Sequence, residues 1–276
     1  MKNDPLQASL LTLLPKGAGT VVHIGCGLAA DLPNWRDLSA ERIYLVEPNP
    51  DLTSDLQDIA NADPKLAFLP LAVARKAGPQ QLNVLNHFDL SSLAAPTGVT
   101  AVFPGARIDV TLPVQAITLE ALIDKVTLSR RRPNLLVIEA AGSEADITAA
   151  LALPGMNAHF AAIMTVLPTK QLFDTVLDAA ALEAAMAKAG YVLVAAEAEQ
   201  NPDWTRSVFA FRQTLVDAQA ALTARTQDIQ QAERRQTLRD NDLNDLRDRL
   251  RRAEQDRDAL ADLLREVTTT LHSNAS

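Results

Sequence analysis

The chain has 276 residues, a formal net charge of −8, 47% hydrophobic residues, one cysteine and four histidines. The negative charge argues against general nucleic-acid binding, and the single cysteine, Cys26, leaves neither an intramolecular disulfide nor a zinc cluster. The histidines show no metal-ligand spacing. Because no apolar run reaches the length of a membrane span and the amino terminus shows no signal-peptide pattern, we expect a soluble, cytoplasmic protein.

The first part of the chain is organised around a glycine-rich unit. After an amphipathic helix at 5–14, the apolar run 20–24 predicts a buried strand, 25–29 a glycine-rich turn, and 42–46 a second buried strand that ends on Glu47. Glycines let a backbone approach a ligand, and a carboxylate at a strand tip can accept hydrogen bonds from both hydroxyls of a ribose. The unit therefore predicts a site for an adenosine-containing cofactor. The alternative is an ordinary strand-to-helix turn that needs glycine for packing.

The chain then alternates strands and helices as far as residue 212. The pattern predicts helices at 50–60, 118–123 (with Thr118 as N-cap), 144–151 and 179–190, and strands at 66–73, 81–86, 107–117, 133–139, 159–166, 191–196 and 207–212. Such alternation is typical of an α/β doubly wound sheet. Ligands of this fold bind outside the carboxyl ends of the strands, where Gly25, Glu47 and Glu139 fall. His23, in the first strand, is expected to be a core histidine with satisfied hydrogen bonds.

A heptad repeat begins at about residue 213, where glycine, proline and lysine disappear. Seven of the nine residues at every seventh position from Leu215 to Leu271 are aliphatic, and Gln236 and Arg257 interrupt them. This spacing predicts a left-handed coiled coil that pairs with a second copy or with a partner coiled-coil protein. A solvated single helix and a nucleic-acid-binding arm are the alternatives. We therefore divide the chain into an α/β domain at 1–213, a coiled-coil helix at 214–272 and a disordered tail at 273–276.

Six short segments resemble, in their order and spacing, the FkbM family of S-adenosylmethionine-dependent methyltransferases. They are VVHIGCGLA (21–29), YLVEPNP (44–50), LAVA (71–74), SSL (91–93), VQAITLEAL (114–122) and LVIEAAGSE (136–144). The resemblance implies a Rossmann-like methyltransferase sheet with S-adenosylmethionine as the cofactor. It also implies that cofactor binding falls to Gly25, Cys26, Gly27 and Glu47. Glu139 would face the site of methyl transfer, and Glu139, Glu144 and His87 are the candidates for a catalytic base.

Four positions depart from the family pattern. His23 stands where the family usually has an acid, Val137 replaces a lysine, Glu139 replaces the shorter aspartate, and Ala141 replaces the acid before Gly142. We expect an O-methyltransferase that acts on a hydroxyl of a small molecule, a sugar or a glycan. The departures favour a second hypothesis, a catalytically degenerate scaffold that works through its coiled coil, in which Glu139 only caps a helix. A nicotinamide dehydrogenase is a third hypothesis, although no Tyr-x-x-x-Lys motif is present.

Overall fold

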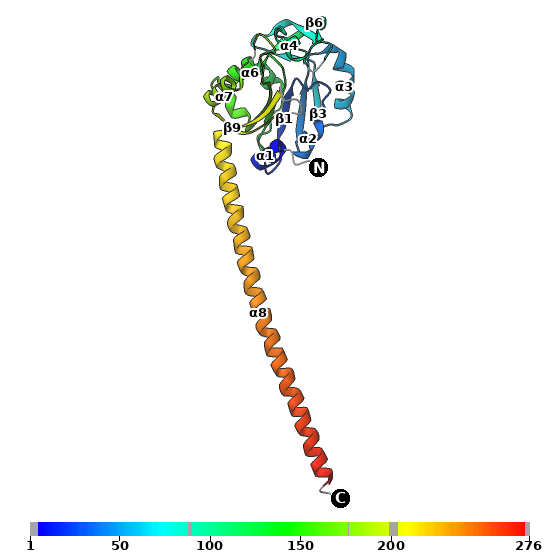
Figure 1. The fold of residues 1–276 in the computed structure, drawn as a ribbon, viewed down its shortest axis with the longest axis vertical. Coiled ribbons are helices and arrows are strands. Elements are labelled where there is room, and N and C mark those ends of the chain that lie inside the picture. The colour runs from blue at the N-terminus through cyan, green and yellow to red at the C-terminus, as the bar shows by residue number, and fades with distance from the viewer. Residues whose placement is uncertain (1–4, 88–89, 176, 199–203, 274–276) are drawn as a thin grey trace. The chain divides into compact units, whose positions relative to one another are not determined.

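The computed structural model describes residues 5–87, 90–175, 177–198 and 204–273, with side chains described as far as Arg265. The chain divides into two compact units, Met1–Ala218 and Gln219–Ser276. The first unit is an α/β domain, and the described residues of the second belong to one long helix (Figure 1). The predicted boundary at residue 213 falls five residues before this division.

Within the described residues, seven strands form the main sheet. In spatial order they are β3 (Leu66–Leu69), β2 (Arg42–Val46), β1 (Thr20–Ile24), β7 (Leu135–Ile138), β8 (Ala162–Pro168), β10 (Trp204–Phe211) and β9 (Tyr191–Ala198). The first five strands run parallel to one another, and β10 runs antiparallel to both of its neighbours. All positions of β1 and β7 are buried, as expected for apolar strands covered on both faces.

Helices cover both faces of this sheet, which confirms the prediction of a doubly wound fold (Figure 1). Side chains of α1 (Pro5–Leu13), α2 (Leu32–Asp37) and α3 (Thr53–Asn61) form one core with alternate residues of the strands. Side chains of α5 (Leu119–Lys125), α6 (Glu144–Leu151) and α7 (Ala179–Lys188) form the core on the other face. Val21 belongs to the first core and Val22 to the second, because successive strand residues point to opposite faces. The 3-10 turn η1 (Pro50–Leu52) leads into α3.

The predicted strand 66–73 was wrong as a single element. The chain divides it into β3 and β4 (Ala72–Val73), which belong to different sheets. Pro70 lies between them and has no N–H to continue a ladder, so the strand stops there. Among the described residues, β4 pairs with β6 (Ile108–Ile117), which pairs with β5 (Gly78–Leu85), to form a separate three-stranded sheet.

The other boundaries shift by a few residues. The strand predicted at 159–166 is β8 and begins at Ala162, because a 3-10 turn, η3 (Met156–His159), extends to His159. Thr118 caps α5 as predicted, since its side-chain oxygen accepts a hydrogen bond from the amide of Ala121 at 3.3 Å. A short helix, α4 (Val99–Val102), was not predicted and lies in the loop between β5 and β6.

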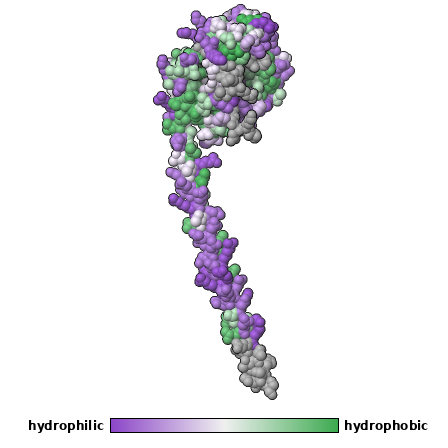
Figure 2. Space-filling model, in the orientation of Figure 1, coloured by the Kyte–Doolittle hydropathy of each residue, from purple (hydrophilic) through white to green (hydrophobic). Residues whose placement is uncertain are grey.

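The carboxyl-terminal heptad region is a single helix, α8 (Arg212–Ser273). Leu215, the first aliphatic residue of the heptad repeat, is half-buried and packs against the core of the α/β domain. Later residues of the repeat are exposed; the exposed fraction is 54% for Leu222, 50% for Leu243 and 61% for Leu250. Figure 2 shows isolated hydrophobic patches along a helix surface that is otherwise hydrophilic. No helix in the described part of the chain is long and apolar enough to cross a membrane. The predicted tail starts at Ser273, which still belongs to α8, and residues 274–276 lie outside the described residues.

Candidate functional site

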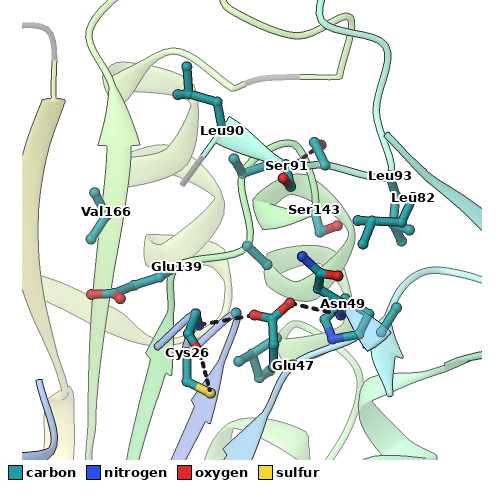
Figure 3. Close-up of a pocket in the computed structure, with 18 of the residues that line it drawn as sticks. Cys26, Glu47, Asn49, Leu82, Leu90, Ser91, Leu93, Glu139, Ser143 and Val166 are labelled. Atoms are coloured by element: carbon teal, nitrogen blue, oxygen red, sulfur yellow. Dashed lines mark hydrogen bonds between the residues drawn. The ribbon is translucent and has the colours of Figure 1, made fainter. Parts of the chain in front are cut away.

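The carboxyl ends of β1, β2 and β7 border a cavity of about 610 Å³ (Figure 3). This volume is within the range of pockets that hold small molecules and cofactors. Every residue predicted from the sequence to belong to the site lines the cavity: Gly25, Cys26, Gly27, Glu47, His87, Glu139 and Glu144. The topology therefore brings together residues from five separate segments, at the edge of the sheet where ligands of this fold bind.

The two glycines of the turn after β1 have different surroundings. Gly25 has a φ of +76°, and a Cβ there would lie 2.7 Å from the carbonyl oxygen of Glu139. It is therefore required for close packing against the end of β7, as the packing alternative for this turn predicts. Gly27 has a φ of +50°, but a Cβ there would meet nothing within 4 Å. Gly27 keeps space open in the cavity, where a ligand could approach its backbone.

Glu47 is held by two backbone amides. Its Oε2 accepts a hydrogen bond from the amide of Gly27 at 3.0 Å, and its Oε1 accepts one from the amide of Asn49 at 3.0 Å. A carboxylate has about four acceptor sites, so roughly two remain for a ligand. Burial raises the pKa of Glu47 above its usual range, while the hydrogen bonds from the two amides act in the opposite direction. The fixed carboxylate can accept two further hydrogen bonds, as many as a ribose diol donates.

Glu139 forms part of a buried hydrogen-bonded chain. His23 lies in β1 with its Nε2 2.9 Å from Oε2 of Glu139, and its Nδ1 accepts a hydrogen bond from the indole Nε1 of Trp35 at 3.2 Å. His23 is 1% exposed, so it is a core histidine with both ring nitrogens satisfied, as predicted. Trp35 was not predicted to belong to the site, because no motif and no regular spacing in the sequence relates it to His23.

The other two candidate catalytic residues lie in different surroundings. Glu144 begins α6 and is fully buried, and neither of its carboxyl oxygens has a hydrogen-bond partner among the described residues. Burial raises the pKa of Glu144 to about 7, although the nearby amides of Glu144 and Gly142 oppose the shift. His87 is exposed, with its ring centroid 6.2 Å from that of Phe103. No hydrogen bond between described residues joins Glu139, Glu144 and His87, so they do not form a catalytic triad.

Cys26 lies between the acids of the cavity. Figure 3 shows Glu139 and Glu47 to either side of it. Burial raises the pKa of the Cys26 thiol far above its usual range, and the charges of Glu47 and Glu139 raise it further. The side chain therefore stays a neutral thiol at physiological pH and contributes a small apolar surface rather than a nucleophile.

The cavity is acidic and partly apolar. Its described lining includes the carboxyl groups of Asp31, Glu47, Glu139 and Glu144 and contains no lysine or arginine. Burial, followed by the charge of Glu139, raises the pKa of Asp31. The sequence did not identify Asp31, nor the apolar residues Leu82, Leu90, Leu93, Phe103, Val166 and Trp204, which line the same cavity. Asp31 precedes α2, and the apolar residues come from the separate sheet, its loops, β8 and β10. No spacing or motif in the sequence indicates that they meet here.

The loop after β5 forms one wall of the cavity and is tied to the end of β7. The hydroxyl of Ser92 donates a hydrogen bond to the carbonyl of Ala141 and accepts one from the amide of Ala94. Gly142 permits this contact, because a Cβ there would lie 2.6 Å from Cβ of Ala94. Within the described residues, no group of three or more His, Cys, Asp or Glu side chains is arranged to hold a metal ion.

Comparisons with known proteins give only distant likenesses. A scan against models of protein families found no match, and a search of curated proteins found none either. Among solved structures, a methyltransferase FkbM from Methylobacillus flagellatus KT shares 11% identity at a TM-score of 0.41, over 70% of this chain and 44% of that one. The present chain thus spans under half the length of that protein.

Two further solved structures cover more of their own length. Magnesium protoporphyrin IX methyltransferase from Synechocystis PCC 6803 shares 10% identity at a TM-score of 0.40, over 75% of this chain and 76% of that one. A 1,6-didemethyltoxoflavin-N1-methyltransferase from Burkholderia thailandensis shares 8% identity at a TM-score of 0.43, over 75% of this chain and 77% of that one. At these identities and TM-scores, the likenesses assign neither an activity nor a substrate to this chain.

Proposed function

We propose that the α/β domain binds S-adenosylmethionine and transfers its methyl group. The observation that carries this proposal is the Glu47 carboxylate, which is held by the amides of Gly27 and Asn49 and retains free acceptor sites at the tip of β2. An acid in this place accepts hydrogen bonds from the two hydroxyls of a ribose. The resemblance to the FkbM family supports the same assignment.

The charge of the cavity favours S-adenosylmethionine over a nicotinamide dinucleotide. The sulfonium and α-amino groups of S-adenosylmethionine are cationic, and the described lining offers four carboxyl groups and no lysine or arginine. A dinucleotide would bring a pyrophosphate close to those acids, where like charges repel. The charge of the cavity therefore argues against the dehydrogenase hypothesis. The absence of a Tyr-x-x-x-Lys motif from the sequence argues against it as well.

The cavity also fits the cofactor in the distribution of its groups. Glu47 would hold the ribose, and the open backbone at Gly27 leaves room beside it. Bound S-adenosylmethionine supplies a methyl group on a sulfonium, which leaves as a neutral thioether when an acceptor atom forms the new bond to carbon. Glu139 is the acid best placed to take a proton from an acceptor hydroxyl, since its Oε1 has no hydrogen-bond partner among the described residues.

The departures from the family pattern weaken catalysis less than the sequence suggested. His23 and Val137 are direct neighbours on β1 and β7. The acid and the lysine that the family usually has at these two positions would therefore lie side by side as an ion pair. In this chain both members of that pair are replaced together. Replacing a buried ion pair as a unit leaves no uncompensated charge behind. The scaffold hypothesis therefore rests mainly on the missing acid at Ala141.

The acceptor is proposed more broadly than the cofactor. A hydroxyl acceptor on a sugar or glycan follows from the family resemblance alone. The apolar side chains of Leu90, Leu93 and Phe103 in the lining favour a small molecule with an apolar part. His87 and Glu144 remain candidates for contacts with the acceptor, and the expected cytoplasmic location remains a prediction.

Isothermal titration calorimetry of the full-length chain tests the proposed function. We expect S-adenosylmethionine and S-adenosylhomocysteine to bind with micromolar affinity, and NAD to bind at least about a hundredfold more weakly. NAD carries the same adenosine and serves as the matched control for charge. If neither sulfur compound binds, the cofactor assignment is wrong and the scaffold hypothesis gains support. If NAD binds as tightly as they do, the electrostatic argument is wrong.

We also propose that residues 214–272 form a coiled coil, and that it self-associates. Leu222, Ile229, Leu243, Leu246 and Leu250 are each 50–61% exposed and share one face of α8 by their heptad spacing. Aliphatic side chains repeated along one helix face over this length are stabilised in water when another helix covers them. A second copy of the chain is the simplest occupant, and a partner coiled-coil protein is the alternative.

Sedimentation equilibrium of the full-length chain and of a Leu243→Asp/Leu250→Asp variant tests self-association. We expect a dimer or higher oligomer for the wild type and a monomer for the variant, because two carboxylates would be buried in the seam. Asp245→Asn, at an exposed position off the seam, is the control and should leave the oligomer intact. A monomeric wild type at high micromolar concentration would rule out self-association and leave a partner protein or a solvated single helix as the alternatives.

A further inference from the structure

The hydrogen bonds around His23 define its tautomer. An indole N–H can only donate, so the nitrogen that accepts from Trp35, Nδ1, carries no hydrogen. The single ring proton of the neutral imidazole must then be on Nε2, which donates it to Oε2 of Glu139 at 2.9 Å. The two rings meet edge to face, with an interplanar angle of 89°. The buried Trp35 side chain thereby fixes which nitrogen of His23 faces the cavity acid.

This arrangement leaves one oxygen of Glu139 for a ligand. His23 is 1% exposed and occupies Oε2, whereas the Glu139 side chain is 19% exposed and lines the cavity. No described residue donates a hydrogen bond to Oε1 of Glu139. A carboxylate with one oxygen anchored by a rigid, buried donor has a fixed direction, which is what a group that must meet a reacting atom requires.

We propose that His23 and Trp35 are positioning residues, which hold the Glu139 carboxylate so that its Oε1 takes the proton of an acceptor hydroxyl during methyl transfer. This inference rests on the function proposed above. As the acceptor oxygen forms its bond to the methyl carbon, the carbon–sulfur bond breaks, the sulfur keeps the electron pair as a neutral thioether, and the proton of the acceptor passes to Oε1. The acceptor must therefore arrive with a proton to give, as a hydroxyl does. His23 keeps its own proton throughout and acts only through Glu139.

Nitrogen NMR of the full-length chain with ¹⁵N-labelled histidine tests the tautomer directly. The His23 signals, identified by their loss in His23→Gln, should show an unprotonated Nδ1 and a protonated Nε2. Trp35→Phe removes the indole donor and should release His23 into a mixture of tautomers. The matched control is Trp204→Phe, the other tryptophan of the chain, which should leave the His23 signals unchanged. A proton on Nδ1 in the wild type would overturn the proposal.

The ratio of the affinities for S-adenosylmethionine and S-adenosylhomocysteine tests the role of Glu139. The two ligands differ by the methyl group and its positive charge, so a well-placed carboxylate favours S-adenosylmethionine. We expect His23→Leu to reduce this preference by about tenfold, the scale of one hydrogen bond to a charged group, with little change in the affinity for S-adenosylhomocysteine. His23→Gln retains a donor toward Glu139 and should restore most of the preference.

The outcomes separate the two proposals. If the wild type binds neither ligand, the proposed function fails, while the NMR result still decides whether His23 has the expected tautomer. If the wild type binds both ligands but His23→Leu leaves the preference unchanged, or lowers both affinities equally, His23 is a structural residue and the positioning role is refuted. Equal losses in His23→Gln and His23→Leu would refute it as well, because the retained donor would then have no effect.

Discussion

Replacing Glu47 by glutamine is the sharpest perturbation of the proposed cofactor site. The two carboxylate oxygens each accept one backbone amide, from Gly27 and from Asn49, both at 3.0 Å. Glutamine has one oxygen and one NH₂ group, and NH₂ cannot accept a hydrogen bond. Whichever way the amide turns, it faces one backbone N–H with another donor and offers one acceptor fewer to a ribose.

The size of the effect follows from the bonds lost. A hydrogen bond to a charged group contributes about 1.5–3 kcal/mol, so losing one bond from the ligand should weaken S-adenosylhomocysteine binding by about ten- to a hundredfold. Glu47→Ala removes both ligand bonds and should weaken binding at least as much. Asp51→Asn removes a nearby exposed acid that does not line the cavity, and should leave the affinity within about a factor of two.

A binding cycle assigns the loss to the ribose. Calorimetry would compare adenosine with 2′-deoxyadenosine in the wild type and in Glu47→Gln. If Glu47 holds the diol, the wild type should prefer adenosine and the variant should lose most of that preference, because the two changes remove the same contact. Equal preferences in both proteins would show that Glu47 does not contact the ribose, even if the variant binds more weakly overall.

Three further predictions follow from the geometry of the site. Gly25→Ala should destabilise the domain by at least about 2 kcal/mol in urea unfolding, since its Cβ would lie 2.7 Å from the carbonyl of Glu139 at a φ of +76°; Gly27→Ala, with open space around it, should cost about 1 kcal/mol but weaken cofactor binding. Glu139→Gln should lower turnover far more than cofactor affinity once an acceptor is known, and unchanged turnover would reduce Glu139 to a helix cap. The third prediction concerns the pH dependence of stability. In the folded state the pKa of Glu144 is about 7, above its ordinary value of 4.5. The contribution of Glu144 to stability is therefore fully present below pH 4.5 and is lost as the pH rises to about 7.

The pH prediction has a defined magnitude and control. At about 1.4 kcal/mol for each pH unit between 4.5 and 7, Glu144 should account for about 3 kcal/mol of lost unfolding free energy. Glu144→Gln should remove that part of the pH dependence, so the variant gains on the wild type as pH rises. Glu183→Gln, at an exposed position in α7, should leave the pH dependence unchanged. A parallel fall in wild type and Glu144→Gln would show that Glu144 does not ionise in this range.

The sequence was most informative where a single local signal decided the structure. The strands 20–24 and 42–46 form as predicted because apolar residues predominate in each. Thr118 caps its helix because its extended backbone lets its side-chain oxygen accept a hydrogen bond from the amide of Ala121. The division of strand 66–73 was missed, although Pro70 was visible. Pro70 separates two strands only because β3 pairs with β2 and β4 pairs with β6. These pairings are set by the tertiary fold and cannot be predicted from the local sequence.

The candidate site was predictable in its residues but not in its interactions. Gly25, Glu47 and Glu139 could be placed at one edge because the carboxyl ends of parallel strands meet there. The contact of Trp35 with His23 was not predictable, because it joins α2 to β1 through the core and leaves no periodic trace. The burial of Glu144 without a hydrogen-bond partner among the described residues was also not predictable, because an acid at the start of a helix is ordinarily solvated.

A crystal structure of the full-length chain grown with S-adenosylhomocysteine tests the central claim most directly. The account predicts the ligand in the cavity at the carboxyl ends of β1, β2 and β7, with both ribose hydroxyls within hydrogen-bond distance of the Glu47 carboxylate. A ligand bound elsewhere, a ribose that does not contact Glu47, or an empty cavity at saturating ligand would contradict it.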